Sequence, residues 1–246
     1  TDIAPLEAVD ELDVSYVSNI SQFGDPDVVI IPGSKNTISD LLWMRQNGLE
    51  GKILRHAAKG GIVFGICGGY QMLGQSISDP TGAEQKGTVR GMGLLPVTTV
   101  FEQEKRRTRV SGRFAKVGGA LAEMSGVCYE GYEIHMGRTV LSKGTVPLVY
   151  MEEEGEQRQD GAQSDHVYGC YMHGIFDMSE TVKTFLAAVL RKKGIDPSKI
   201  TVRDRNAYKE EQYDRLASIV RENLNMEAVY KIIEKGNEAS CSLLSE

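Results

Sequence analysis

Hydrophobic residues in the first third of the chain come in short apolar runs separated by stretches with helical spacing. Val14–Val17, Val28–Ile31 and Ile62–Ile66 have the length and composition of strands. Between the last two, the pattern predicts helices over Thr37–Asn47, with its first residue as N-cap, and over Leu49–Lys59. This order of elements predicts an α/β fold with a mostly parallel central sheet and helices on both faces.

The middle of the chain has a different pattern. Residues 75–126 are rich in Gly, Thr, Lys and Arg and contain only short apolar runs, which predicts loops and antiparallel strands added to the sheet. Further strands are expected over Glu130–Arg138, Leu148–Met151 and Val167–Met172. The acidic, polar stretch Glu152–Asp165 is expected to form an exposed hairpin loop.

The last third of the chain has helical periodicity. Apolar residues recur on one face of each of three expected helices, and such stripes normally face a core. The stripes are Val182, Phe185, Leu186, Val189 and Leu190; Tyr213, Leu216, Ile219, Val220 and Leu224; and Val229, Ile232 and Ile233. We expect one domain over residues 1–236 and a polar, disordered tail over residues 237–246.

Composition argues against several classes of protein. The chain has 246 residues, enough for one large domain. With 28 Lys and Arg against 34 Asp and Glu, its net charge of −6 argues against nucleic-acid binding. The longest apolar runs have the length of strands, so we expect no membrane span. No basic and apolar leader opens the chain, so we expect no signal peptide.

The four cysteines, Cys67, Cys128, Cys170 and Cys241, show neither a CxxC pair nor the spacing of a zinc site. This usage predicts a reduced, cytoplasmic protein without a metal site. We interpret Cys128 and Cys170 as core residues.

The segment Gly65–Gln71, Gly-Ile-Cys-Gly-Gly-Tyr-Gln, is the strongest indication of chemistry. It follows an apolar run and leads into a short helix, which is typical of a nucleophile elbow with sulfur in place of oxygen. The glycines around Cys67 fit a tight, strained turn that exposes the thiol at the carboxyl edge of the sheet. The positive end of the following helix favours the thiolate. The alternative is a buried cysteine in a glycine-rich turn.

Two further segments supply partners for this thiol. Val167–Gly174 reads as a strand ending in His173, and a thiol nucleophile needs a base that can lie far away in sequence. Because ligands of open α/β sheets bind at the carboxyl edge, we expect Cys67 and His173 to meet there. In the turn after the second apolar run, the N–H of Gly33 can form an oxyanion hole with that of Gly68.

Four motifs occur in an order that points to one family. They are Ile31–Thr37, Gly65–Gly74, Gly131–Thr139 and Tyr171–Asp177. From its opening Thr1–Leu6 to about Ile233, the sequence resembles the glutamine amidotransferase domain of the cobyric acid synthases. These belong to the cobalamin branch of the class I (triad) amidotransferases, so the resemblance implies a class I amidotransferase-like fold. The cysteine elbow marks only the superfamily, whereas the Ser-Lys-Asn-Thr loop and the Gly131–Thr139 segment are specific to the branch.

The resemblance implies that the chain hydrolyses L-glutamine to glutamate and ammonia. Cys67 would attack the amide carbon and form a thioester. His173 would transfer the protons, and the N–H groups of Gly33 and Gly68 would hold the oxyanion.

Other residues around this core are candidates for supporting roles. Arg109 stands where related enzymes place a residue for the substrate carboxylate, although a solvated basic run is an equal alternative. Gln71 is expected to support the site through hydrogen bonds. Related enzymes carry Glu two residues after the histidine, but Ile175 stands there, and Asp177 is the nearest acidic residue that follows. The site is therefore either a dyad or takes its third group from elsewhere.

Glu133 and His135 form another polar pair. They alternate to the same face of an expected strand. This face can line the crevice, contact a partner domain, or hold a purely structural hydrogen-bonded pair.

The resemblance also implies partners. In the family, the ammonia serves ATP-dependent amidation of corrin-ring carboxylates, and an N-terminal synthetase domain binds ATP, Mg²⁺ and the corrinoid acceptor. The sequence has no Gly-x-x-x-x-Gly-Lys-Ser/Thr loop, so we expect no cofactor in this chain. Residues 1–10 are interpreted as the remnant of the join to that domain. Two alternatives remain: the glutaminase domain of another amidating ligase, such as an a,c-diamide synthase or a cell-wall enzyme, and a non-catalytic module on the same fold.

Overall fold

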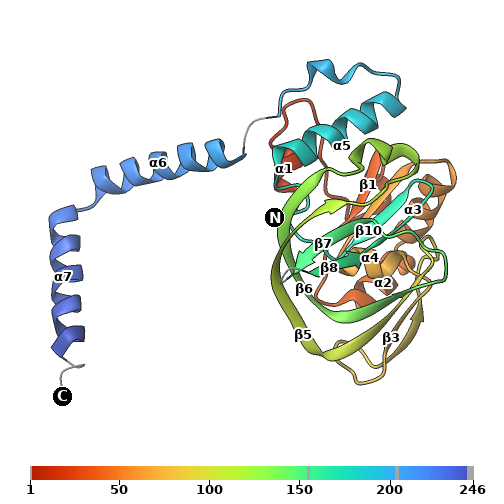
Figure 1. The fold of residues 1–246 in the computed structure, drawn as a ribbon, viewed down its shortest axis with the longest axis horizontal. Helices are drawn as coiled ribbons and strands as arrows, with labels where there is room; N and C mark the ends of the chain where they lie inside the picture. The colour runs from red at the N-terminus through yellow and green to blue at the C-terminus, as the bar shows by residue number, and fades with distance from the viewer. Residues whose placement is uncertain (1, 154–155, 203–204, 243–246) are drawn as a thin grey trace. The chain divides into compact units, whose positions relative to one another are not determined.

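The strands expected at Val28–Ile31 (β1) and Ile62–Ile66 (β2) are present in the computed structural model, which describes residues 2–153, 156–202 and 205–242. Contacts divide the chain into two units, Thr1–Val202 and Arg203–Glu246. The first unit holds both sheets (Figure 1) and every residue that the sequence places in the site.

The helical elements of the first unit are α1 (Ala4–Glu7), η1 (Ile20–Gln22), α2 (Thr37–Gln46), α3 (Leu49–Ala58), α4 (Gly68–Leu73), η2 (Gly119–Met124), α5 (Ser179–Lys192) and η3 (Pro197–Lys199), where η marks a 3-10 helix. Its other strands are β3 (Ser76–Asp79), β4 (Gly87–Arg90), β5 (Val97–Phe114), β6 (Cys128–Leu141), β7 (Val149–Glu153), β8 (Glu156–Asp160), β9 (Ala162–Ser164) and β10 (Val167–Cys170). The two helices expected before β2 are confirmed. Thr37 is the first residue of α2, however, and Asn36 takes the N-cap position.

Three parallel strands form most of the first sheet. Its order is β1–β2–β10–β9, in which β2 pairs in parallel with β1 and β10, and β9 is antiparallel. The register aligns the last residues of the three parallel strands, so all three end at one edge of the sheet. The segments that follow them carry Gly33, Cys67 and His173.

The strands of the middle segment form a second sheet. Its order is β4–β3–β5–β7–β8, and β6 pairs with β5. These two strands make a long, curved antiparallel ribbon that runs from the Val97–Leu141 pair to the Arg113–Cys128 pair (Figure 1). The antiparallel strands expected in this segment are confirmed, but they form a sheet of their own and do not extend the central one. They satisfy their backbone groups within the second sheet, while the first sheet ends at the three-residue β9.

The stretch Glu152–Asp165 is not the exposed loop that its polarity suggested. In it, β8 pairs with β7 and β9 pairs with β10, and Asp160 and Ala162 are buried. Some of its polar side chains point inward, because Arg158 forms an ion pair with the buried Glu133.

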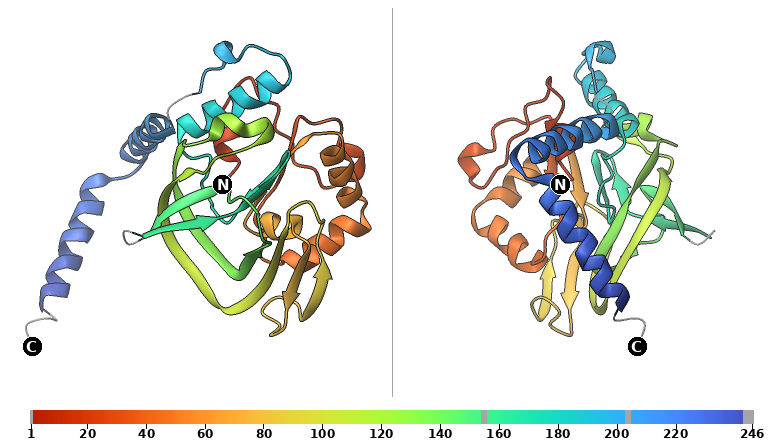
Figure 2. Two further views of the ribbon diagram at one scale, coloured as in Figure 1. Left: turned by 45° about the vertical axis from the view of Figure 1, so that its right-hand side comes forward. Right: turned by 90° about the vertical axis from the view of Figure 1, so that its left-hand side faces the viewer.

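Helices cover both faces of the first sheet, which confirms that part of the expected fold. α2 and α3 lie on one side, and α5 lies with η2 on the other (Figure 2). Between sheet and helices, the Phe64 ring packs against Tyr168 and Phe176, with centroid distances of 6.5 and 5.6 Å. The apolar stripe expected on α5 is buried apart from the half-buried Leu190.

Two smaller expectations were wrong. Val14–Val17 is not a strand: it pairs with no described strand, and the Tyr16 side chain is 70% exposed. Cys128 is exposed at the first position of β6, whereas Cys170 is fully buried as expected.

The second unit consists, as far as it is described, of α6 (Arg205–Asn223) and α7 (Met226–Ser242). Its apolar stripes do not face a core: Tyr213, Leu216 and Ile232 are 60%, 58% and 71% exposed. Two helices alone bury too little surface to enclose one.

The segment expected to be a disordered tail, residues 237–246, overlaps α7. Residues 237–242 belong to that helix, and residues 243–246 lie outside the described residues. The domain limit at residue 236 stays a prediction. None of the described helices is both long and apolar enough to cross a membrane.

The β3–β4 turn yields a stability prediction. The fully buried carboxylate of Asp79 accepts four main-chain N–H groups, from Gly82, Ala83, Glu84 and Gln85, at 2.8 to 2.9 Å. Burial alone raises the pKa of Asp79, but these hydrogen bonds outweigh it and lower that pKa. We expect Asp79→Ala to lower the free energy of unfolding by about 2 kcal/mol at neutral pH, and Asp79→Asn, which keeps one oxygen, to lower it less.

Because the folded-state pKa lies below the unfolded one, this stabilisation is present above about pH 4 and is lost as the pH falls further. Urea unfolding of the parent and Asp79→Ala at neutral and acidic pH measures the difference. A difference that does not shrink in acid would contradict the assignment.

Candidate active site

Cys67 occupies a strained turn between β2 and α4. Its φ is +51°, and Cys67 and Asp165 are the only non-glycine residues with positive φ among those the structure describes. Such a conformation costs on the order of 1–3 kcal/mol and persists only where its surroundings enforce it. The packing here does so, since a Cβ on Gly69 would lie 2.0 Å from the main-chain oxygen of Ile31. The elbow expected from the glycine-rich motif is therefore present.

His173 meets Cys67 from the end of β10. A Cβ on Gly33 would lie 2.8 Å from Cε1 of His173 and 3.6 Å from Cβ of Cys67, so the three segments come together at one point. The His173 backbone pairs with Tyr132 of β6 through hydrogen bonds of 2.9 and 3.1 Å, and the two rings stack with centroids 5.1 Å apart. The long ribbon thus fixes the histidine.

The third polar group at this site is Asp2. Its Oδ2 lies 2.8 Å from Nδ1 of His173, and its Oδ1 accepts the N–H of Gly174 at 2.9 Å. Its side chain is only 11% exposed. The position where related enzymes carry Glu holds the buried Ile175.

Asp2 lies 171 residues before the histidine, in the segment interpreted from sequence as a mere join. The only signal for it in the sequence was the missing glutamate, which indicated a group from elsewhere.

The charges around His173 set its protonation. Burial alone lowers the pKa of His173, but the Asp2 carboxylate and the ionised form of Cys67 outweigh it and raise that pKa to about 9. For Asp2, burial raises the pKa, but hydrogen bonds from His173 and Gly174 lower it overall. At neutral pH the ring is therefore protonated. Because Asp2 engages Nδ1, Nε2 is the nitrogen left for the thiol.

The loop after β1 packs directly on the elbow. A Cβ on Gly68 would lie 2.8 Å from the main-chain nitrogen of Ser34. Gly33 and Gly68 are thus neighbours of the thiol on two sides. Their role as oxyanion donors stays a prediction.

Gln71 and Arg109 have different surroundings. Gln71 is buried in α4, and its Nε2 donates to the Tyr171 hydroxyl at 3.1 Å, which suits a supporting role. Arg109 is exposed on β5, directly opposite Tyr132 of β6. Residues directly opposite each other in an antiparallel pair share a face, so Arg109 lies on the same face as the ring that stacks on His173. Its contact with substrate stays a prediction.

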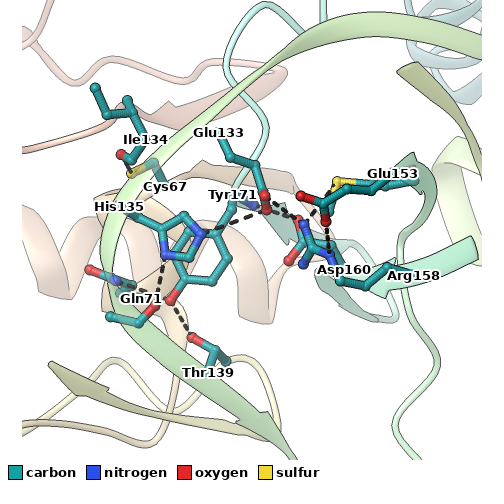
Figure 3. Close-up of polar contacts among 12 residues, drawn as sticks. Cys67, Gln71, Glu133, Ile134, His135, Thr139, Glu153, Arg158, Asp160 and Tyr171 are labelled. Carbon is teal, nitrogen blue, oxygen red and sulfur yellow. Dashed lines mark hydrogen bonds and ion pairs between the residues drawn. The ribbon is translucent and has the colours of Figure 1, made fainter. Parts of the chain in front are cut away.

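A cluster of polar side chains lies next to the thiol (Figure 3). The Cys67 thiol donates to the main-chain oxygen of Ile134, at 3.6 Å. Glu133 and His135, on either side of Ile134, share a face as expected, with Oε1 and Nε2 3.6 Å apart. Glu133 is fully buried, which excludes contact with a partner domain for this residue. Within the described residues, no three His, Cys, Asp or Glu side chains are grouped to hold a metal.

Comparison with known proteins agrees with this geometry. The CobB/CobQ-like glutamine amidotransferase domain matches residues 1–181. Cobyric acid synthase from Ruminiclostridium cellulolyticum is 50% identical over 242 residues, covering 97% of this chain and 47% of that protein. Cobyric acid synthase from Lachnoclostridium phytofermentans is 42% identical over 246 residues, covering 96% of this chain and 48% of that protein. The chain spans about half the length of these curated relatives.

Solved structures confirm the class I amidotransferase fold. One glutamine amidotransferase crystal structure has a TM-score of 0.54 at 16% identity and covers 76% of this chain and 90% of its own. The structure of PurLQS from Thermotoga maritima has a TM-score of 0.53 at 18% identity, with coverages of 73% and 85%. The relatives above confirm the resemblance inferred from the four sequence motifs. The chain is a glutamine amidotransferase domain and belongs to the CobB/CobQ-like family.

Proposed function

We propose that this domain hydrolyses L-glutamine to glutamate and ammonia through a thioester on Cys67. The proposal rests on one observation. Cys67, His173 and Asp2 lie far apart in the sequence, but the fold brings their side chains together. These residue types match the nucleophile, the base and the orienting group of cysteine hydrolases. A non-catalytic module has no need of a strained cysteine turn beside a carboxylate-bound histidine.

The first half of the reaction forms the thioester. The Cys67 thiolate attacks the amide carbon, and the C=O electrons move to oxygen. Gly33 and Gly68 are the proposed donors to this oxyanion, and loss of one such donor costs about 3 kcal/mol of barrier. The C–N bond then breaks as protonated His173 gives its proton to the nitrogen, and ammonia leaves.

The second half restores the enzyme. Neutral His173 takes a proton from water, which attacks the thioester and releases glutamate and the thiolate. Asp2 holds the Nδ1–H throughout, which keeps the productive tautomer. Arg109 is proposed to bind the α-carboxylate of the substrate.

The ammonia is proposed to serve ATP-dependent amidation of corrin-ring carboxylates in cobalamin biosynthesis. Support comes from the relatives named cobyric acid synthase, whose other half leaves room for a separate N-terminal synthetase domain. That domain is the proposed site of ATP, Mg²⁺ and the corrinoid, and no cofactor is proposed for this chain. The described cysteines Cys67, Cys128 and Cys170 are free thiols, which fits a cytoplasmic setting.

Replacing the nucleophile tests the covalent step. We expect Cys67→Ser to abolish glutamate release from glutamine, because a serine hydroxyl forms no stable anion beside His173. Cys128→Ser, at an exposed cysteine outside the site, is the matched control and should keep the parent rate. Glutamate release by Cys67→Ser at the parent rate would rule out the thioester.

Replacing Asp2 tests the third member of the triad. We expect Asp2→Asn to lower kcat/KM by about 100-fold or more, because the ring loses its orienting charge. Asp2 also raises the pKa of His173, so its loss should move the alkaline fall of kcat/KM from near pH 9 toward neutral pH. Full pH profiles of the parent, Asp2→Asn and Asp177→Asn separate the two candidate carboxylates. A shifted profile in Asp177→Asn, with Asp2→Asn unchanged, would contradict the assignment.

The synthetase domain should activate the glutaminase. A flipped peptide at Gly33 would remove one oxyanion donor, and restoring it is worth about a hundredfold or more in rate. We expect glutamate release at saturating glutamine to rise by this order when the synthetase domain, ATP and a corrinoid acceptor are added. Equal turnover with and without them would indicate a free-standing glutaminase.

A further inference from the structure

Strand β6 places two ionisable side chains, Glu133 and His135, on either side of the residue that contacts the thiol. Ile134 lies between them, and its main-chain oxygen accepts the hydrogen bond from Cys67. Because side chains alternate along a strand, Glu133 and His135 point to the face opposite the Ile134 side chain. The proposed reaction uses neither of them.

Glu133 is a buried charge with defined partners. Its Oε2 lies 2.5 Å from Nη2 of Arg158 on β8, and its Oε1 lies 3.6 Å from Nε2 of His135. Burial alone raises the pKa of Glu133, but His135 and Arg158 outweigh it and lower that pKa to about 2. The carboxylate therefore stays ionised and ties β6 to β8.

His135 extends these contacts to the strand end that carries the catalytic histidine. Its ring stacks on Tyr171, with centroids 3.7 Å apart and planes at 15°, and its Nδ1 lies 2.8 Å from the oxygen of Gly137. The Tyr171 hydroxyl accepts from Gln71 and lies 2.6 Å from the Thr139 hydroxyl (Figure 3).

The cluster joins β6 to the two segments of the chain that carry Cys67 and His173. Gln71 lies on α4 just after Cys67, and Tyr171 lies two residues before His173. The Tyr171 N–H donates to the carboxylate of Asp160, at the end of β8, at 2.8 Å. Displacement of β6 would therefore change the positions of both the Cys67 thiol and the His173 imidazole.

Stability alone gives a weak reason for such a cluster. Removing an ion pair from water carries a desolvation penalty that its Coulomb attraction often fails to offset, and well-packed apolar residues are commonly as stable. Charged hydrogen bonds instead fix the relative orientation of the groups that they join, because their strength depends on geometry.

We propose that Glu133 and His135 are positioning residues for the Cys67 reaction. They hold β6 in place, so that the Ile134 main-chain oxygen keeps its hydrogen bond with the Cys67 thiol and Tyr132 keeps its backbone pairing with His173. This role rests on the proposed glutaminase function and deepens it.

The chain offers a matched control for Glu133. Glu50 is also a buried carboxylate paired with an arginine, since Arg45 donates to both of its oxygens at 2.6 and 2.8 Å. It lies on α3, and the hydrogen bonds and ion pair of its carboxylate go to Arg45, which is not a site residue. Glu133→Gln and Glu50→Gln therefore make the same chemical change in two comparable pairs.

The experiment measures alkylation of Cys67 in the whole chain by azaserine, a glutamine-shaped electrophile, and by iodoacetamide, which needs only the thiolate. Peptide mass spectrometry separates Cys67 from the other cysteines, and thermal unfolding reports stability. We expect Glu133→Gln to slow azaserine labelling by roughly 10- to 100-fold, with Glu50→Gln within about twofold of the parent. Iodoacetamide labelling should change by no more than about threefold in either variant, because positioning matters little to a small reagent.

A second variant guards against a folding defect. His135→Phe keeps an aromatic ring on Tyr171 but loses both nitrogen contacts, so it should also slow azaserine labelling while melting near the parent temperature. Azaserine labelling of Glu133→Gln or His135→Phe at the parent rate, or slowed only as much as in Glu50→Gln, would overturn the positioning role. Failure of the proposed function has a different signature, because azaserine would then not label Cys67 in the parent, and both proposals would fall together.

Discussion

The strained turn at Cys67 is the constraint on which the site depends. A non-glycine residue at φ +51° needs surroundings that leave it no alternative. Here these are the parallel pairing of β2 with β1 and β10 and the close packing of Gly69 against Ile31. The same pairing that enforces the turn also brings the ends of the neighbouring strands, with Gly33 and His173, to the thiol.

The sequence predicted these three segments because each carries a local signal. A run such as Ile62–Ile66 is short and apolar enough to be a buried strand, and glycines around a cysteine specify a tight turn. Ends of parallel strands meet at one edge, so the positions of Cys67 and His173 followed from the expected sheet. Their catalytic roles stay predictions.

Asp2 had no such signal. Its hydrogen bond to His173 spans 171 residues, and the segment around it forms only the four-residue α1. Polar composition led to a wrong prediction elsewhere for a related reason. Hydropathy shows which side chains prefer water, but it does not show which polar side chains form ion pairs in the protein interior. Arg158 lies in a polar stretch that looked exposed, yet it pairs with the buried Glu133. The converse holds for α6 and α7, whose apolar residues, such as Leu216 and Ile232, stay exposed.

The second sheet shapes the site by covering it. The β5–β6 ribbon brings Tyr132 onto His173 and the Ile134 oxygen onto Cys67, while Asp2 closes the far side of the imidazole. Both the Asp2 carboxylate and the ionised form of Cys67 favour the protonated ring over the neutral one, against the effect of burial. In the proposed reaction, this is the proton that the departing nitrogen would take.

An NMR titration of the His173 ring in the parent chain tests this balance most directly. We expect the ring to titrate with a pKa of about 9, well above the value near 6.5 of an unperturbed imidazole. A pKa at or below about 6.5 in the folded chain would mean that burial prevails over Asp2 and Cys67. That result would contradict the assignment of Asp2, His173 and Cys67 as one catalytic unit.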